Sequence, residues 1–155
     1  MSRIDPAADV RREASAQASL ARLQQREHPM CIVCSPHHPN GLKLKFAAQT
    51  DGSVVAVFDC RPILQGYPQV LHGGVIATVL DSAMVHALFA IGIVAVTATM
   101  EVRYLAPTVT GRFAMVRGWT EGSKTHPPYA QSAHLTQDGK VMAEAHGTFV
   151  VPGVF

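Results

Sequence analysis

The sequence has few charged side chains. Only 15% of its 155 residues are Asp, Glu, Lys or Arg, against about 25% in an average soluble domain. The 13 basic and 11 acidic residues leave a net charge of +2, without the clustered Lys and Arg that nucleic-acid binding requires. We therefore expect no nucleic-acid partner. A hydrophobic share of 48% argues against disorder, and the length suits one domain. So little charge suggests that a second copy covers part of the surface.

Cysteine is also scarce, because the chain has only Cys31, Cys34 and Cys60. An odd, small number of cysteines indicates reduced thiols rather than a disulfide framework. Residues 2–27 alternate in charge and lack the apolar segment of a signal peptide. These features predict a cytoplasmic protein.

Two of the cysteines have the spacing of metal ligands. Cys31 and Cys34 form a C-x2-C pair, and His37 and His38 follow closely. No second cluster of matching spacing accompanies them, and the pair fits a loop that leads into a strand. We therefore expect no metal and no cofactor.

One long stretch has no charged residue at all, namely the 19 positions between Asp81 and Glu101. Such a length could cross a bilayer, but the apolar period changes within it. Residues 75–91 are apolar on almost every face at helical spacing, which is typical of a buried helix that ends at Gly92. Residues 94–104 alternate, as a strand does. The stretch therefore predicts a core helix followed by a central strand, with no membrane span.

The rest of the chain supplies an N-terminal helix and more strands. Asp5 and Pro6 favour a helix start, and the helix is expected over residues 6–26. Alternating runs predict further strands at residues 42–46, 53–59, 112–120, 129–137 and 141–151. Short turns between them imply antiparallel pairing. We expect an α+β fold in which a roughly six-stranded sheet wraps one long helix, with residues 1–29 as a helical arm and 30–155 as the main domain.

Residues that suit chemistry gather at the start of the buried helix. Gly73 and Gly74 allow a ligand to approach the first-turn N–H groups, which have no partner inside a helix. The helix dipole adds partial positive charge there, so the position suits an anion or a developing oxyanion. Asp81 lies two turns later, in a helix that is otherwise nearly all apolar. A carboxylate in such surroundings is paired, protonated or functional.

The segment His72-Gly73-Gly74, with Asp81 nine positions after the histidine, resembles the signature of hot-dog fold acyl-CoA thioesterases of the PaaI type. The preceding loop Gln65-Gly66-Tyr67-Pro68 is similar as well. Further similar segments are residues 31–34, 40–42, 97–108, 138–140 and 143–145. The resemblance spans residues 31–151 and predicts the hot-dog fold. The sequence departs from the family pattern at Ser82, where many members have Glu, and at Gly66, where some have Asn or Gln.

The resemblance implies hydrolysis of an acyl- or aryl-acyl-CoA to a free acid and CoA. By resemblance, Asp81 is the nucleophile or the general base, and the N–H groups of Gly73 and Gly74 polarise the thioester carbonyl. His72 then positions the site, and Thr97 holds the attacking water. The active site is expected between subunits of a homodimer or a dimer of dimers. Residues expected to contact the substrate or CoA are Gln65, Gly66, Ser82, Arg103 and Lys124.

Two other functions stay open at this point. A hot-dog dehydratase or hydratase needs a histidine base at a different spacing. A protein that binds acyl-CoA without hydrolysing it is the other alternative. Regulators of that kind carry a helical DNA-binding domain, for which residues 1–27 are too short and lack a basic cluster.

Overall fold

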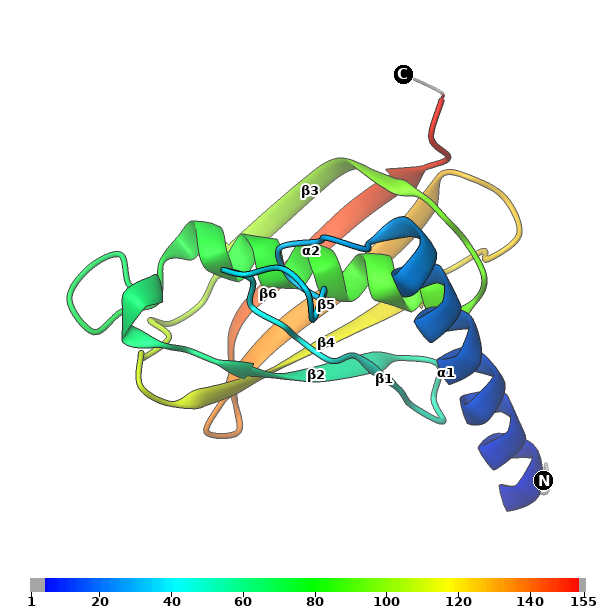
Figure 1. Cartoon of the computed structure of the whole chain (residues 1–155), viewed down its shortest axis with the longest axis horizontal. Coiled ribbons are helices and arrows are strands. Elements are labelled where there is room, and N and C mark those ends of the chain that lie inside the picture. The colour runs from blue at the N-terminus through cyan, green and yellow to red at the C-terminus, as the bar shows by residue number, and fades with distance from the viewer. Residues whose placement is uncertain (1–4, 154–155) are drawn as a thin grey trace.

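The structure of the protein is a computed structural model that describes residues 5–153. One long helix lies across a single sheet (Figure 1). A second helix and a short 3-10 helix complete the regular structure. The elements in chain order are α1 (Pro6–Glu27), β1 (Ala47–Ala48), β2 (Val54–Asp59), η1 (Pro62–Leu64), α2 (Gly73–Ala90), β3 (Val96–Tyr104), β4 (Phe113–Glu121), β5 (Tyr129–Gln137) and β6 (Lys140–Val150).

The six strands form one antiparallel sheet in the order β1-β2-β4-β5-β6-β3. This architecture confirms the predicted α+β class, with about six strands around one long helix. The prediction of a central strand at residues 94–104 was wrong, because β3 lies at an edge and pairs only with β6 in the described chain. Most of its side chains are exposed in the single chain. A long unpaired edge of this kind is a template for pairing with another chain.

The core of the fold is α2. Figure 1 shows it crossing the face of strands β4 to β6. Gly118 on β4 permits the close approach, because a Cβ there would lie 2.3 Å from the Ala83 carbonyl oxygen. By length and composition α2 could span a membrane, but 67% of it is buried inside the fold. It is therefore the core helix that the sequence predicts.

The first helix, α1, packs on the C-terminal part of α2. It begins as predicted, with the Asp5 carboxylate accepting the Ala7 N–H at 3.1 Å. Leu20 and Leu23 are buried in the core, and Ser19 Oγ donates a hydrogen bond to the Phe89 carbonyl at 2.8 Å. These contacts fix the end of α1 over α2.

Residues 42–46 do not form the predicted strand. The burial of their side chains alternates as expected, but the N–H groups of Leu42 and Leu44 bond to carbonyls of the preceding loop, at 2.7 and 2.8 Å. Lys43 has a left-handed φ of 54°, which breaks a regular strand. Only Ala47–Ala48 pairs with β2. The apolar alternation therefore predicted the buried face correctly and the backbone pairing wrongly.

Candidate active site

The structure brings Asp81 and Thr97 together. Asp81 lies in the third turn of α2, half-buried. Thr97 Oγ1 of β3 donates a hydrogen bond to Asp81 Oδ1 at 2.5 Å. Both groups belong to the same chain. The structure therefore brings together, within one chain, two residues to which the resemblance assigns catalytic roles.

A β-bulge aims Thr97 at α2. The pairing of β3 with β6 shifts register between Thr97 and Thr99, which places one extra residue in β3 and changes which side chains face the helix. After the bulge, Met100 and Val102 pack toward the core. Simple alternation would put Thr97 on the opposite face from these two residues, so the sequence pattern alone could not place its hydroxyl.

Two opposing effects act on the ionisation of the Asp81 carboxyl. Burial raises the pKa of the Asp81 carboxyl above its ordinary value, and the hydrogen bond from Thr97 lowers it again. Charge on His28 also lowers this pKa, and a negative charge on Cys31 raises it. A carboxylate with a raised pKa and a fixed hydroxyl neighbour is suited to accept a proton from water near neutral pH.

The N-terminus of α2 leaves one N–H group available. His72 is the N-cap, and its Nδ1 accepts the Gly74 N–H at 2.9 Å. The Val75 N–H bonds to the His72 carbonyl at 3.0 Å. No hydrogen bond involves the Gly73 N–H among the described residues. Of the two glycines expected to donate to a thioester oxygen, Gly73 is therefore free to do so, whereas the Gly74 N–H is already bonded.

Gly73 and Asp81 are too far apart to act on one carbonyl within a single chain. They are eight residues apart in an unbroken helix, which corresponds to about 12 Å along the axis at 1.5 Å per residue. A water-activating base and an oxyanion donor must both lie near the reacting carbon, each at about hydrogen-bond distance from the atom it serves. Within one chain, Gly73 and Asp81 therefore do not meet at a single carbonyl.

Two adjoining pockets border Gly73. The larger part of the lining of the first is apolar and includes Tyr67, Ile76 and Tyr104, with a volume of about 380 Å³. The second is lined by Gly66, Tyr67, Leu71, His72 and Gly73. Gly73 therefore lies beside space in which a substrate can be placed.

Three of the expected substrate contacts have different surroundings. Gly66 lies beside His72, since a Cβ on it would be 3.2 Å from the imidazole ring. Gln65 is exposed, but its side-chain oxygen accepts the Gln69 N–H at 3.0 Å and braces the loop. Ser82 is 4% exposed and faces the core, where its Oγ lies 3.4 Å from His86 Nδ1. Ser82 lies about 100° around α2 from Asp81, and its buried position does not support the expected contact with substrate.

The two basic residues expected at CoA do not meet in space. Arg103 is exposed on β3 and pairs with Glu144 of β6 at 3.3 Å. Lys124 lines a pocket with Arg117 and Trp119. These two β4 residues alternate with the buried ones that face α2, so that pocket lies on the other face of the sheet. Within the chain, the expected role of Lys124 at a site built on α2 is therefore not supported.

Sequence reasoning missed Tyr104 and gave Tyr67 no role. The Tyr104 hydroxyl donates to the Gly73 carbonyl at 2.7 Å, and the residue is 54% exposed. Tyr67 is 83% exposed and lines both pockets at Gly73. In the sequence, Tyr104 is only an aromatic residue at the end of a predicted strand. That position does not indicate that its ring contacts Gly73.

Known proteins share this architecture. The model of the thioesterase superfamily matches residues 68–125, which include Gly73, Asp81 and Thr97. The PaaI protein of the E. coli phenylacetic acid degradation operon superposes with a TM-score of 0.73 at 15% identity, over 91% of this chain and 96% of its own.

Two further solved structures agree. A phenylacetic acid degradation-related protein from Ralstonia eutropha gives a TM-score of 0.68 at 20% identity, over 86% of this chain and 99% of its own. Zebra fish thioesterase superfamily member 2 gives 0.65 at 22% identity, over 83% and 95%. No curated protein sequence matches the chain. The fold is therefore the hot-dog fold, as the sequence predicts.

Proposed function

We propose that this hot-dog fold protein of the thioesterase superfamily hydrolyses the thioester of an acyl- or aryl-acyl-CoA to a free acid and CoA. The observation that carries the proposal is the Asp81–Thr97 pair, a half-buried carboxylate hydrogen-bonded by a hydroxyl at 2.5 Å. The free Gly73 N–H at the start of the same helix supports it.

The proposed chemistry follows from these groups. Asp81 takes a proton from a water molecule that attacks the thioester carbonyl, and Thr97 holds the carboxylate in place. The Gly73 N–H and the helix dipole stabilise the oxyanion that forms. The intermediate collapses by expelling the CoA thiolate, a good leaving group, which then takes up a proton. Direct attack by Asp81 on the carbonyl, followed by hydrolysis of the acyl-enzyme, is the other role open to this carboxylate.

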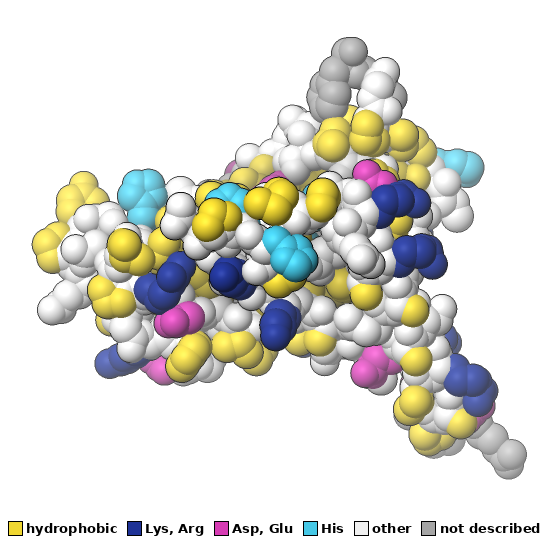
Figure 2. All heavy atoms as spheres, in the orientation of Figure 1, with side chains coloured by type: hydrophobic (Ala, Val, Ile, Leu, Met, Phe, Trp, Pro, Cys, Tyr) yellow, Lys and Arg dark blue, Asp and Glu magenta, His cyan; other side chains and the backbone are white. Residues whose placement is uncertain are grey.

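We propose that two copies of the chain complete each site, with Gly73 from one copy and Asp81 from the other. The separation of about 12 Å between them in one helix supports this arrangement. The free edge of β3 offers backbone groups for pairing with a second sheet. Figure 2 shows apolar side chains interspersed with Lys, Arg and His side chains and with few acidic ones on this face. A homodimer is the smallest assembly that fits, and a dimer of dimers would also satisfy it.

The pockets at Gly73 suit a substrate with an apolar portion. The volume of about 380 Å³ lies within the range of about 300–1,000 Å³ that is usual for small-molecule sites. Tyr67 and Tyr104 provide aromatic walls on which an acyl chain or an aromatic ring can pack. The E. coli PaaI protein belongs to a phenylacetic acid degradation operon, so phenylacetyl-CoA is a reasonable first aryl substrate to test.

The surroundings of His72 disfavour a dehydratase or hydratase. Its Nδ1 accepts the Gly74 N–H, so a neutral ring carries its proton on Nε2. Nε2 then donates rather than accepts, which suits positioning of a substrate and not removal of its proton. All three cysteines are free, which is consistent with the reducing cytoplasm that we propose as the location.

A direct assay tests the proposal. Purified protein is offered a panel of short-, medium- and long-chain acyl-CoAs, together with phenylacetyl-CoA, and released thiol is measured with a thiol reagent. We expect release with at least one chain class, and loss of that release in Asp81→Asn. Binding of an acyl-CoA without release by the wild type would instead support the non-hydrolytic alternative.

A further inference from the structure

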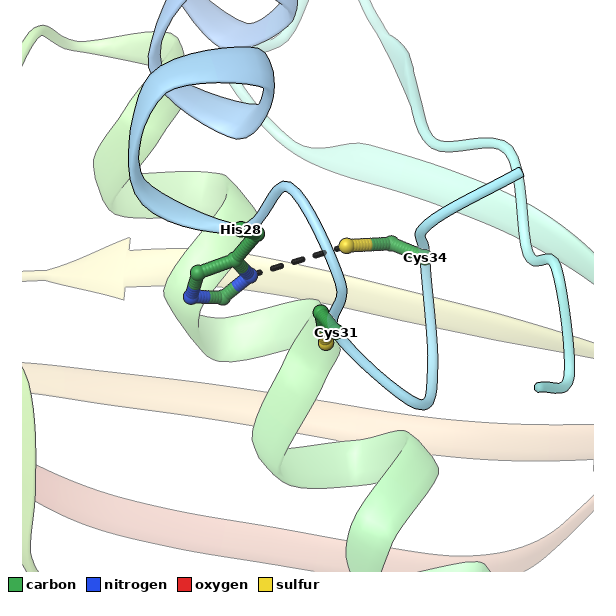
Figure 3. Close-up of side chains that lie close together, drawn as sticks. All are labelled: His28, Cys31 and Cys34. Carbon is green, nitrogen blue, oxygen red and sulfur yellow. Dashed lines mark hydrogen bonds between the residues drawn. The ribbon is translucent and has the colours of Figure 1, made fainter. Parts of the chain in front are cut away.

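A cluster of thiol and imidazole groups lies outside the proposed active site. His28, Cys31 and Cys34 each offer one ligand atom, and the three atoms lie within 4.8 Å of one another. Figure 3 shows them on the loop that follows α1, above α2. Sequence reasoning considered His37 and His38 as partners of the cysteines, and the structure brings His28 to them instead.

The distance between two of these atoms fits a shared tetrahedral ion. His28 Nδ1 lies 3.5 Å from Cys34 Sγ. With Zn–S of about 2.3 Å and Zn–N of about 2.05 Å at a tetrahedral angle, the two ligand atoms should be about 3.5 Å apart. The imidazole therefore needs no large movement to bind the same ion as the thiol.

The backbone around Cys31 stabilises a thiolate. The Val33 N–H donates to Cys31 Sγ at 3.4 Å. Amide hydrogen bonds to the sulfur are the kind of outer support that fixes a metal-binding thiolate.

The loop that carries the cluster is held in shape by its own hydrogen bonds. The Cys31 N–H bonds to the His28 carbonyl at 3.3 Å, and the Ser35 N–H bonds to the Cys31 carbonyl at 3.0 Å. Gln24 of α1 donates to the Cys34 carbonyl at 3.0 Å. The three ligand atoms therefore belong to a preformed turn, so little ordering entropy is lost when an ion binds.

An ion can reach the cluster from solvent. His28 borders an open pocket of about 510 Å³ that Pro29 and His37 also line, and the Cys31 side chain is partly exposed. Two thiolates and a neutral imidazole balance the charge of a divalent ion, and this ligand set favours Zn²⁺ among common metals.

We infer that His28, Cys31 and Cys34 bind one Zn²⁺ ion that ties the end of α1 to the loop over α2, with a water molecule as the fourth ligand. The inference does not rest on the proposed hydrolysis, although His28 and Cys31 act electrostatically on Asp81. It differs from the sequence-based expectation that the chain takes no metal.

Metal titration tests the inference. Full-length protein is purified under reducing conditions, stripped with a chelator and titrated with Co²⁺, whose visible absorption reports thiolate coordination; Zn²⁺ is then added as competitor. We expect about one equivalent per chain for the wild type, displaced by Zn²⁺. Binding should fall at least about 10-fold in Cys31→Ser, Cys34→Ser and His28→Ala. Cys60→Ser and His37→Ala are the matched controls and should keep full stoichiometry.

Thermal unfolding of the stripped wild type gives a second measurement that does not depend on the variants folding. The unfolding midpoint should rise with free Zn²⁺, because only the folded state has the preformed site. Absence of Co²⁺ and Zn²⁺ binding by the reduced wild type would overturn the inference. So would unchanged binding in Cys31→Ser and Cys34→Ser, or a native Cys31–Cys34 disulfide in protein that holds no metal.

Discussion

The N-terminus of α2 and the turn that carries Asp81 belong to one helix but differ in surroundings. Gly73 borders two pockets and presents a free N–H, while its carbonyl is held by Tyr104. Asp81 is half-buried, and its carboxylate is held by Thr97 from the edge strand. The first position can stabilise negative charge and the second can take up a proton. The difference fits the proposal that each chain supplies complementary halves of two sites.

The largest effect is expected at Asp81. Asp81→Asn keeps the size of the side chain but removes its ability to accept a proton from water. We expect kcat/KM to fall by about 10²–10⁴-fold, the usual contribution of a general base, as measured by thiol release. Asp59→Asn, at an exposed carboxylate at the end of β2, should retain wild-type activity. Full activity in Asp81→Asn would remove this residue from the chemistry.

The role of the helix N-terminus is tested by a variant that removes the Gly73 N–H. Gly73→Pro deletes the N–H at the first helical position, which accepts proline readily, and the extended His72 backbone (ψ 131°) suits a residue before proline. We expect kcat to fall by about 10²–10³-fold through loss of an oxyanion donor. Gly73→Ala keeps the N–H, and its Cβ would lie 3.4 Å from the Tyr104 ring, an ordinary contact. Equal losses in both variants would indicate a steric effect instead.

A smaller effect, with a pH signature, is expected at Thr97. Because the ionised carboxylate is the active form, activity is lost as pH falls through the pKa of Asp81, which burial raises above its ordinary value. The Thr97 hydrogen bond lowers that pKa, so Thr97→Val should move the acid limb of kcat/KM to higher pH. It should also reduce activity about 10-fold. His28 and Cys31 also act on this carboxyl, and both stay unchanged in the variant.

The conservative variant Thr97→Ser is the control, since it keeps the hydroxyl. It should restore the acid limb to its wild-type position. An acid limb that does not move in Thr97→Val would show that the hydrogen bond has no influence on the group that titrates.

The smallest effect is expected one residue from Asp81. Ser82 faces the core beside His86, so Ser82→Ala should change kcat/KM by less than about 2-fold. It should lower the free energy of unfolding by about 1 kcal/mol, through loss of a buried hydrogen bond, as measured by urea denaturation. A large change in KM with unchanged stability would place Ser82 at the substrate after all.

The sequence predicted the positions of the helices and strands better than it predicted which strands pair with each other. The helical period before Gly92 and the alternation after it identified α2 and β3 correctly. Which strand lies at the edge depends on long-range pairing, and no local pattern records that. Residues 42–46 show the same limit, because their apolar side chains alternate while their backbone bonds to a loop.

The part of the candidate site that lies on α2 could be predicted, because its residues have a characteristic spacing in the sequence. His72, Gly73 and Asp81 could be selected from the resemblance and from the cost of a carboxylate in an apolar helix. The orientation of the Thr97 side chain depends on a β-bulge. The proximity of His28 to Cys31 depends on where α1 ends. Neither feature has a local sequence signature, so only the three-dimensional arrangement revealed them.

The most direct test of the shared site mixes two inactive variants. Gly73→Pro and Asp81→Asn protein are combined, unfolded and refolded together, with a tag on one variant to verify that mixed dimers form. Half of the dimers should be mixed, and each of these should hold one intact site, which predicts recovery of about one quarter of the wild-type thiol release. Activity that stays at the level of the single variants, with mixed dimers present, would contradict a site built from Gly73 of one copy and Asp81 of the other.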